Sequence, residues 1–213
     1  MNIALTGSSG LIGSRLLKDL KKINYNCFCI SSSQSAPDKN IYSYEDMLSG
    51  QVPESIDCMI HLASMNSDIS ELDITSEIEI TNNVIKGMSL MSCKKIIFFS
   101  TAKVYGDNSF EEQLFLENSP LNPCCPYSKA KAKCEEVISQ NAENLDYQYL
   151  IFRSAPVLVN DSRSNVGKLF KVIGNGLPIP SFKAGDSNLR SFVSYEFIFS
   201  ILKVALDAEP HNY

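Results

Sequence analysis

The first residues that could do chemistry form a glycine-rich loop near the start of the chain, Thr6-Gly7-Ser8-Ser9-Gly10-Leu11-Ile12-Gly13. An apolar run at residues 3–5 precedes the loop, as in a buried parallel strand, and apolar residues at helical spacing follow it. In a strand-to-helix turn, Gly7 permits the tight turn, Gly10 lets a pyrophosphate approach the backbone, and Gly13 lets the helix pack on the strand. Turns and linkers use the same residues, but this context predicts a dinucleotide site at the helix N-terminus.

A second candidate for chemistry is the segment PYSKAK at residues 126–131. Pro126 suits a first helical turn, and Tyr127 and Lys131 are then neighbours on one helix face. A phenol titrates near ~10, but an ammonium about 4 Å away at an effective dielectric near 20 contributes roughly 4 kcal/mol, or about three pKa units. Lys131 is therefore expected to lower the pKa of Tyr127 and prepare it for proton transfer. The alternative is a surface Tyr beside a solvated Lys, in a basic stripe with Lys129 and Lys133.

The elements that must position these residues alternate along the chain as a doubly wound sheet requires. Strands are expected at residues 26–30, 56–63, 94–100 and 147–153, and helices at residues 127–140 and 195–206. The helix between Asn83 and Lys94 looks short, and residues 30–40 are expected to form a polar loop. The fold class expected is α/β, a Rossmann-type doubly wound parallel sheet. Residues 1–155 are expected to form the NAD(P)-binding domain, and residues 156–213 a partial substrate-binding region packed on the same domain.

Composition fits a soluble enzyme and excludes several other classes. A chain of 213 residues suffices for one domain, and a formal net charge of −5 points neither to nucleic acid nor to a membrane surface. The chain has no leader pattern and no apolar run near the ~20 residues of a membrane span, so we expect a cytoplasmic protein. The seven cysteines lack paired metal-ligand spacing, so no metal site is expected. Cys124 and Cys125 are expected to be reduced thiols rather than a redox pair.

Five stretches taken together resemble the extended short-chain dehydrogenase/reductase family, and within it the nucleotide-sugar epimerases and dehydratases. They are the TGxxGxxG loop at 6–13, DCMIHLAS at 57–64, FFSTAKVYG at 98–106, YxxxK at 127–131 and LRSFVSYEF at 189–197. Their order and spacing agree over nearly the whole chain. The resemblance implies an NAD(P)-dependent enzyme that acts on a nucleotide-diphosphate sugar, and it makes a homodimer an expectation.

The resemblance also implies roles for individual residues. Tyr127 is similar to the family's catalytic acid/base, and Lys131 to the residue that lowers its pKa and binds the nicotinamide ribose. Thr101 stands where the family hydrogen-bonds the reacting sugar, and Arg190 where a guanidinium contacts the diphosphate, unless it is simply a surface Arg. The cofactor-binding residues implied are Gly7, Ser9, Gly10, Leu11, Ile12, Gly13, Ser31, Leu62, Ala63, Ser100, Tyr127 and Lys131. His61, at a strand end, is expected to be structural rather than catalytic.

Three departures from the family pattern narrow the expected activity. Ala102 and Lys103 follow Thr101 where the dehydratase branch has an acidic pair, so elimination of water lacks its acid and base. The second strand ends in serines from Ser31 onward instead of a carboxylate, so NAD is expected with NADP as an alternative. The chain stops at EPHNY, about where relatives continue with another strand, so an abbreviated protein or a fragment with a truncated substrate region is expected.

Two hypotheses from different classes follow from these observations. The first is an NAD(P)-dependent nucleotide-sugar epimerase, or a keto-sugar reductase of the same family, that uses Thr101, Tyr127 and Lys131. The second is a non-catalytic dinucleotide-binding module that keeps the glycine loop but lacks a closed substrate site.

Overall fold

The computed structural model describes residues 1–32, 35–53, 55–64, 69–106, 114–159, 165–176 and 191–208. In chain order, its helices and strands are β1 (Asn2–Thr6), α1 (Leu11–Lys22), β2 (Asn26–Ser31), β3 (Ile41–Ser43), α2 (Tyr44–Leu48), β4 (Cys58–His61), α3 (Ile74–Leu90), β5 (Lys95–Thr101), α4 (Pro126–Leu145), β6 (Gln148–Ser154), β7 (Val157–Leu158), α5 (Asn165–Gly174), β8 (Val193–Ser194) and α6 (Tyr195–Asp207). None of these described helices is both long enough and apolar enough to cross a membrane.

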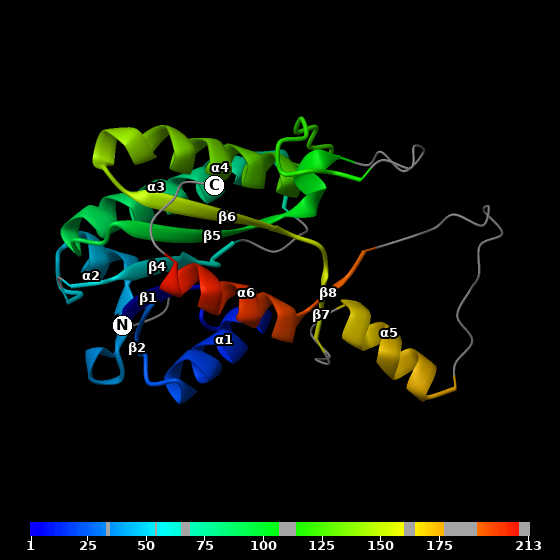
Figure 1. Ribbon diagram of the computed structural model, residues 1–213, viewed down its shortest axis with the longest axis horizontal. Helices are drawn as coiled ribbons and strands as arrows, with labels where there is room; N and C mark the ends of the chain where they lie inside the picture. Colours follow the sequence, from blue (N-terminus) through cyan, green and yellow to red (C-terminus); the bar gives the residue numbers. More distant parts are fainter. Residues whose placement is uncertain are drawn as a thin grey trace.

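Six parallel strands form one sheet in the order β3-β2-β1-β4-β5-β6. The order reverses at β1, because the chain first adds β2 and β3 on one side and then returns to add β4, β5 and β6 on the other. In open sheets of this kind, ligands bind outside the carboxyl ends of the strands at that reversal. The predicted α/β, doubly wound parallel sheet is confirmed, and its reversal lies between β1 and β4 (Figure 1).

Helices cover both faces of this sheet (Figure 1). On one face, α2, α3 and α4 pack on a buried core that includes Met59, Phe98 and Ile138. On the other face, α1 and α6 pack on a second core that includes Leu5 and Ile60. The central strands β1, β4 and β5 are buried on both faces, which explains why their sequences are nearly continuous apolar runs.

The chain beyond β6 contributes to this core through α6. Ile198, Leu202 and Leu206 of α6 lie among the buried residues on the α1 face of the sheet. At the start of α6, Glu196 pairs with Arg15 of α1 at 2.5 Å. The strands β7 and β8 pair with each other, and α5 lies beyond them, away from the main sheet (Figure 1). The proposed division at residue 155 stays a prediction.

Several elements differ from the sequence-based expectation. The helix expected to be short is α3, which has 17 residues. The expectation was too short because the first half of α3 carries polar residues such as Glu77 and Glu79 that obscure the apolar spacing. The three-residue strand β3 is too short to show a periodicity, and α5 lies in a segment where no helix was expected. Helix α4 continues to Leu145. All seven cysteines are free thiols, as predicted for Cys124 and Cys125.

Truncation of Leu202 tests whether α6 is part of the core. Leu202 is fully buried against the sheet, so Leu202→Ala is expected to lower the free energy of unfolding by about 2–5 kcal/mol. Val204 is two residues away and 70% exposed, so Val204→Ala is expected to change stability by less than about 0.5 kcal/mol. Denaturant unfolding of both variants measures the two changes. Equal effects would contradict the packing of α6 described here.

Candidate active site

A cavity of about 300 Å³ opens at the carboxyl ends of the central strands, where α1 and α4 begin. Ten of the residues predicted from the sequence line it, namely Gly7, Gly10, Leu11, Ile12, Gly13, Leu62, Ser100, Thr101, Tyr127 and Lys131. The fold therefore brings the glycine loop and the YxxxK motif together, although more than 110 residues separate them in the chain.

Some predicted site residues lie elsewhere, and some lining residues were not predicted. Ser31 ends β2 and, like Ser9 and Ala63, is not among the lining residues. Arg190 lies outside the described residues. The lining residues that the sequence did not suggest are Ser64, Phe99, Ser154, Ala155, Pro156 and Val157. Ser154 is the last residue of β6 and residues 155–157 directly follow it, so the rule that ligands bind at strand ends could have found them.

The glycine loop makes a turn that larger residues would block. Gly7 has a φ of +70°, and a Cβ there would lie 2.7 Å from the backbone nitrogen of Ala63. A Cβ on Gly13 would overlap the carbonyl oxygen of Gly7, whose oxygen also accepts a hydrogen bond from the Gly10 nitrogen at 3.0 Å. Among the described residues, no side chain caps α1 and its first turn is free of acidic groups. The loop and the positive end of α1 therefore fit the diphosphate of a dinucleotide.

Lys131 is buried at the base of the cavity, with 2% of its surface exposed. Its Nζ lies 4.7 Å from the ring centroid of Phe98, an arrangement that favours a cation over the ring face. Burial lowers the pKa of Lys131, whereas the carboxylates of Glu77 and Glu135 act in the opposite direction. The side chain of Lys131 is thus surrounded by protein groups rather than by water.

The predicted effect of Lys131 on Tyr127 is wrong for this arrangement. Burial raises the pKa of Tyr127 to about 12, and the negative charges of Glu77 and Cys125 add to the rise. Sequence spacing places Tyr127 and Lys131 on one helix face, but it does not reveal how far the phenol is buried or that the charge of Glu77 on α3 acts on it. Tyr127 is therefore a protonated phenol at neutral pH, able to donate a proton.

Thr101 places its side chain at the same cavity, at the end of β5. Its backbone is extended, and its Oγ1 accepts a hydrogen bond from the backbone nitrogen of Lys103 at 3.3 Å. This bond occupies one lone pair of the hydroxyl, and the hydroxyl proton remains available to a ligand group. Ala102 and Lys103 begin the 3-10 turn that follows, so the strand end carries no carboxylate at these positions.

His61 ties the strand ends together beneath the cavity, as the sequence predicted for a structural residue. Its Nδ1 lies 2.7 Å from the Thr6 hydroxyl of β1, and its Nε2 lies 3.3 Å from the Thr81 hydroxyl of α3. The Thr6 hydroxyl in turn accepts a hydrogen bond from the Ala63 nitrogen at 3.0 Å. Burial lowers the pKa of His61 to about 3, and the positive charge of Lys131 adds to this shift. The imidazole is therefore neutral at physiological pH.

Replacement of Gly13 tests the glycine loop. Gly13→Ala forces a Cβ against the Gly7 carbonyl, so we expect a loss of about 1–3 kcal/mol in stability and a loss of dinucleotide binding. Gly174 ends α5 with open space around it, so Gly174→Ala is the matched control, with unchanged binding and with stability unchanged or raised by up to about 1 kcal/mol. Calorimetric binding and thermal unfolding provide both measurements. Tight dinucleotide binding by Gly13→Ala would contradict the binding of the diphosphate by the glycine loop.

The low pKa of His61 predicts a pH dependence of stability. Below about pH 6.5 the unfolded chain binds a proton at this residue, but the folded chain binds it only near pH 3. The free energy of unfolding therefore decreases as the pH is lowered from about 6.5 towards 3. Between pH 7 and pH 5 this one group accounts for about 2 kcal/mol. His61→Gln removes the titrating group, so urea unfolding of the variant is expected to show that much less loss over the same pH range. Parallel pH profiles for the two proteins would refute the assignment.

Comparison with known proteins gives three findings. The chain is 28% identical over its whole length to an N-acetyl-α-D-glucosaminyl-diphospho-ditrans,octacis-undecaprenol 4-epimerase from Escherichia coli O157:H7, and it spans 66% of that relative's length. A UDP-N-acetylglucosamine 4-epimerase from Bacillus cereus shares the fold with a TM-score of 0.84 at 18% identity, over all of this chain and 76% of the other. A UDP-glucose 4-epimerase from Thermus thermophilus, solved in complex with NAD, gives a TM-score of 0.76 at 19% identity, again over all of this chain and 76% of the other.

A family model provides the assignment. The model of the NAD dependent epimerase/dehydratase family matches residues 3–207. This range is nearly the whole chain and includes both the glycine loop and the YxxxK motif. The cavity described above unites the same two motifs. The chain belongs to the NAD dependent epimerase/dehydratase family.

Proposed function

We propose that this chain is an NAD-dependent nucleotide-sugar epimerase in which Tyr127 is the acid/base. The observation that carries the proposal is the single cavity lined by the glycine loop, Thr101, Tyr127 and Lys131. The similarity to 4-epimerases of nucleotide sugars and of a diphospho-linked sugar supports the substrate class. The absence of a carboxylate pair after Thr101 favours epimerisation or ketone reduction over elimination of water.

The chain's own residues would hold the dinucleotide in three ways. The backbone of Gly7, Gly10 and Gly13 at the start of α1 would bind the diphosphate. Lys131 would reach the nicotinamide ribose from beneath, as the family resemblance implies. Bound NAD supplies a hydride acceptor and a positive charge on its nicotinamide ring. The assignment of Ser9, Ser31 and Ala63 to the cofactor, and of Arg190 to the sugar diphosphate, stays a prediction.

Tyr127 and Thr101 would act on the sugar. Tyr127 would accept the proton of the reacting hydroxyl as the sugar is oxidised and return it when the ketone is reduced on its other face. Because burial and Glu77 keep the phenol protonated, positive charge brought into the cavity is needed to favour its anion. Thr101 would hold the same sugar oxygen through its hydroxyl. A cytoplasmic location and a homodimer stay predictions.

Replacement of Tyr127 by Phe tests this function. Tyr127→Phe removes the proton-transfer group and little volume, so we expect turnover of UDP-glucose or UDP-N-acetylglucosamine to fall by about 10²–10⁴. Binding of NAD is expected to change by less than about threefold, because the glycine loop is unaltered. Tyr25 directly precedes β2, at the amino ends of the strands and outside the cavity lining, so Tyr25→Phe is the matched control.

The same measurement separates the alternatives. A steady-state assay of the wild type with each UDP-sugar gives the turnover, and calorimetric titration of NAD gives its dissociation constant. Unchanged turnover in Tyr127→Phe would rule out the role of the phenol. NAD binding with no response to any sugar nucleotide would favour a non-catalytic dinucleotide-binding module. Turnover only of a keto-sugar, reduced to the alcohol as NADH is oxidised to NAD, would favour a reductase.

A further inference from the structure

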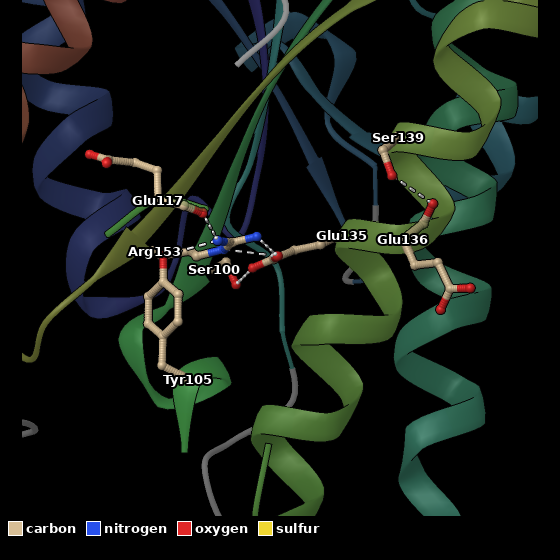
Figure 2. A network of polar contacts seen from close by, with 7 residues as sticks. All are labelled: Ser100, Tyr105, Glu117, Glu135, Glu136, Ser139 and Arg153. Carbon is tan, nitrogen blue, oxygen red and sulfur yellow. Dashed lines mark hydrogen bonds and ion pairs between the residues drawn. The ribbon is translucent and has the colours of Figure 1, made fainter. Parts of the chain in front are cut away.

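A buried carboxylate lies directly behind the cavity. Glu135 is on α4, one helical turn beyond Lys131, and only 3% of its surface is exposed. Its Oε1 accepts a hydrogen bond from the Ser100 hydroxyl at the end of β5, and its Oε2 accepts bonds from Nε and Nη2 of Arg153 at 3.0 and 2.8 Å (Figure 2). Glu135 therefore joins β5, β6 and α4 through a single side chain.

Arg153 fixes this carboxylate in place. Its remaining nitrogen, Nη1, donates to the Tyr105 hydroxyl at 2.9 Å and to the Glu117 carbonyl oxygen at 2.8 Å (Figure 2). Its guanidinium carbon also lies 5.2 Å from the centroid of the Tyr105 ring. A guanidinium is always charged, and a carboxylate that receives two of its N–H groups is stabilised as an anion. Glu135 is therefore an ionised acceptor in a fixed orientation.

The ionised carboxylate determines what Ser100 can offer to a ligand. A serine hydroxyl has one proton and two lone pairs, and an ionised carboxylate can only accept. The proton of Ser100 is thus committed to Glu135. Ser100 also lines the cavity beside Thr101, with Tyr127 and Lys131. Toward that cavity, its oxygen can present only lone pairs, so a ligand group bound there must be a hydrogen-bond donor.

We propose that Glu135 is a positioning residue that makes Ser100 an obligate acceptor for the carboxamide amino group of the nicotinamide. This inference rests on the proposed function, because Thr101, Tyr127 and Lys131 place the reacting ring of the dinucleotide beside Ser100. Besides the ribose on its nitrogen, that ring carries the carboxamide, whose amino group is a donor only. Glu135 contributes to cofactor recognition without touching the cofactor.

The test compares two dinucleotides that differ in this one donor. NAD carries the carboxamide, whereas 3-acetylpyridine adenine dinucleotide has a methyl ketone of similar shape with no N–H group. Calorimetric dissociation constants for the wild type are expected to favour NAD by about three- to tenfold, the contribution of one neutral hydrogen bond. In Glu135→Gln the new side-chain amide donates to Ser100 and releases its proton, so the preference is expected to fall toward one.

Two further variants keep the test decisive. Glu136 follows Glu135 and lies on the outer side of α4, away from Arg153 (Figure 2), where it pairs with Lys133 at 2.7 Å. Glu136→Gln is therefore the matched control, and its preference for NAD over the analogue is expected to be unchanged. Ser100→Ala removes the acceptor but leaves the Glu135 and Arg153 pair, so it is expected to lose the preference even if Glu135→Gln fails to fold.

The outcomes separate this inference from the proposed function. Binding of NAD by the wild type without preference over the analogue would overturn the role of Ser100 while the proposed function stands. A preference that survives in Ser100→Ala, or in folded Glu135→Gln, would overturn it equally. Failure of the wild type to bind either dinucleotide would instead refute the proposed function, and this inference with it.

Discussion

The arrangement of the site depends on the burial of one positive charge. An ammonium taken out of water loses several kcal/mol of solvation unless the interior compensates it. For Lys131 the compensation comes from different elements, because Glu77 belongs to α3, Glu135 to α4 and the ring of Phe98 to β5. The three elements must therefore keep their relative positions for the charge to be tolerated. Helix α4 is anchored through its own lysine.

A second, neutral set of contacts keeps the ends of the central strands in register around that charge. His61 links Thr6 of β1 to Thr81 of α3, and its imidazole packs against Phe98 with ring centroids 5.3 Å apart. A charged imidazole this close to Lys131 would add a repulsion, so a neutral ring is the compatible choice. The charged and the neutral sets share Phe98, which contacts both Lys131 and His61.

Sequence reasoning recovers the local parts of this design and misses the long-range parts. The glycine loop and the Tyr127 and Lys131 pair are visible because a few neighbouring residues decide them, through turn geometry and helix spacing. The strands of the sheet are visible because burial on both faces leaves continuous apolar runs. By contrast, the positions of Glu77 and Glu135 beside Lys131 depend on how α3, α4 and β5 pack. The sign of the Tyr127 pKa shift depends on burial, which residue types at a given spacing do not specify.

Strand β6 gives the molecule a property of a different kind. Within the described part of the chain it is the last strand of the sheet, and its outer edge faces an open groove of about 1910 Å³ between α4 and α6. Its residues Tyr149, Leu150, Ile151 and Phe152 are half-buried and carry no charge, and the charge of Arg153 in the same strand is paired with Glu135. Such an edge is a template for another extended backbone.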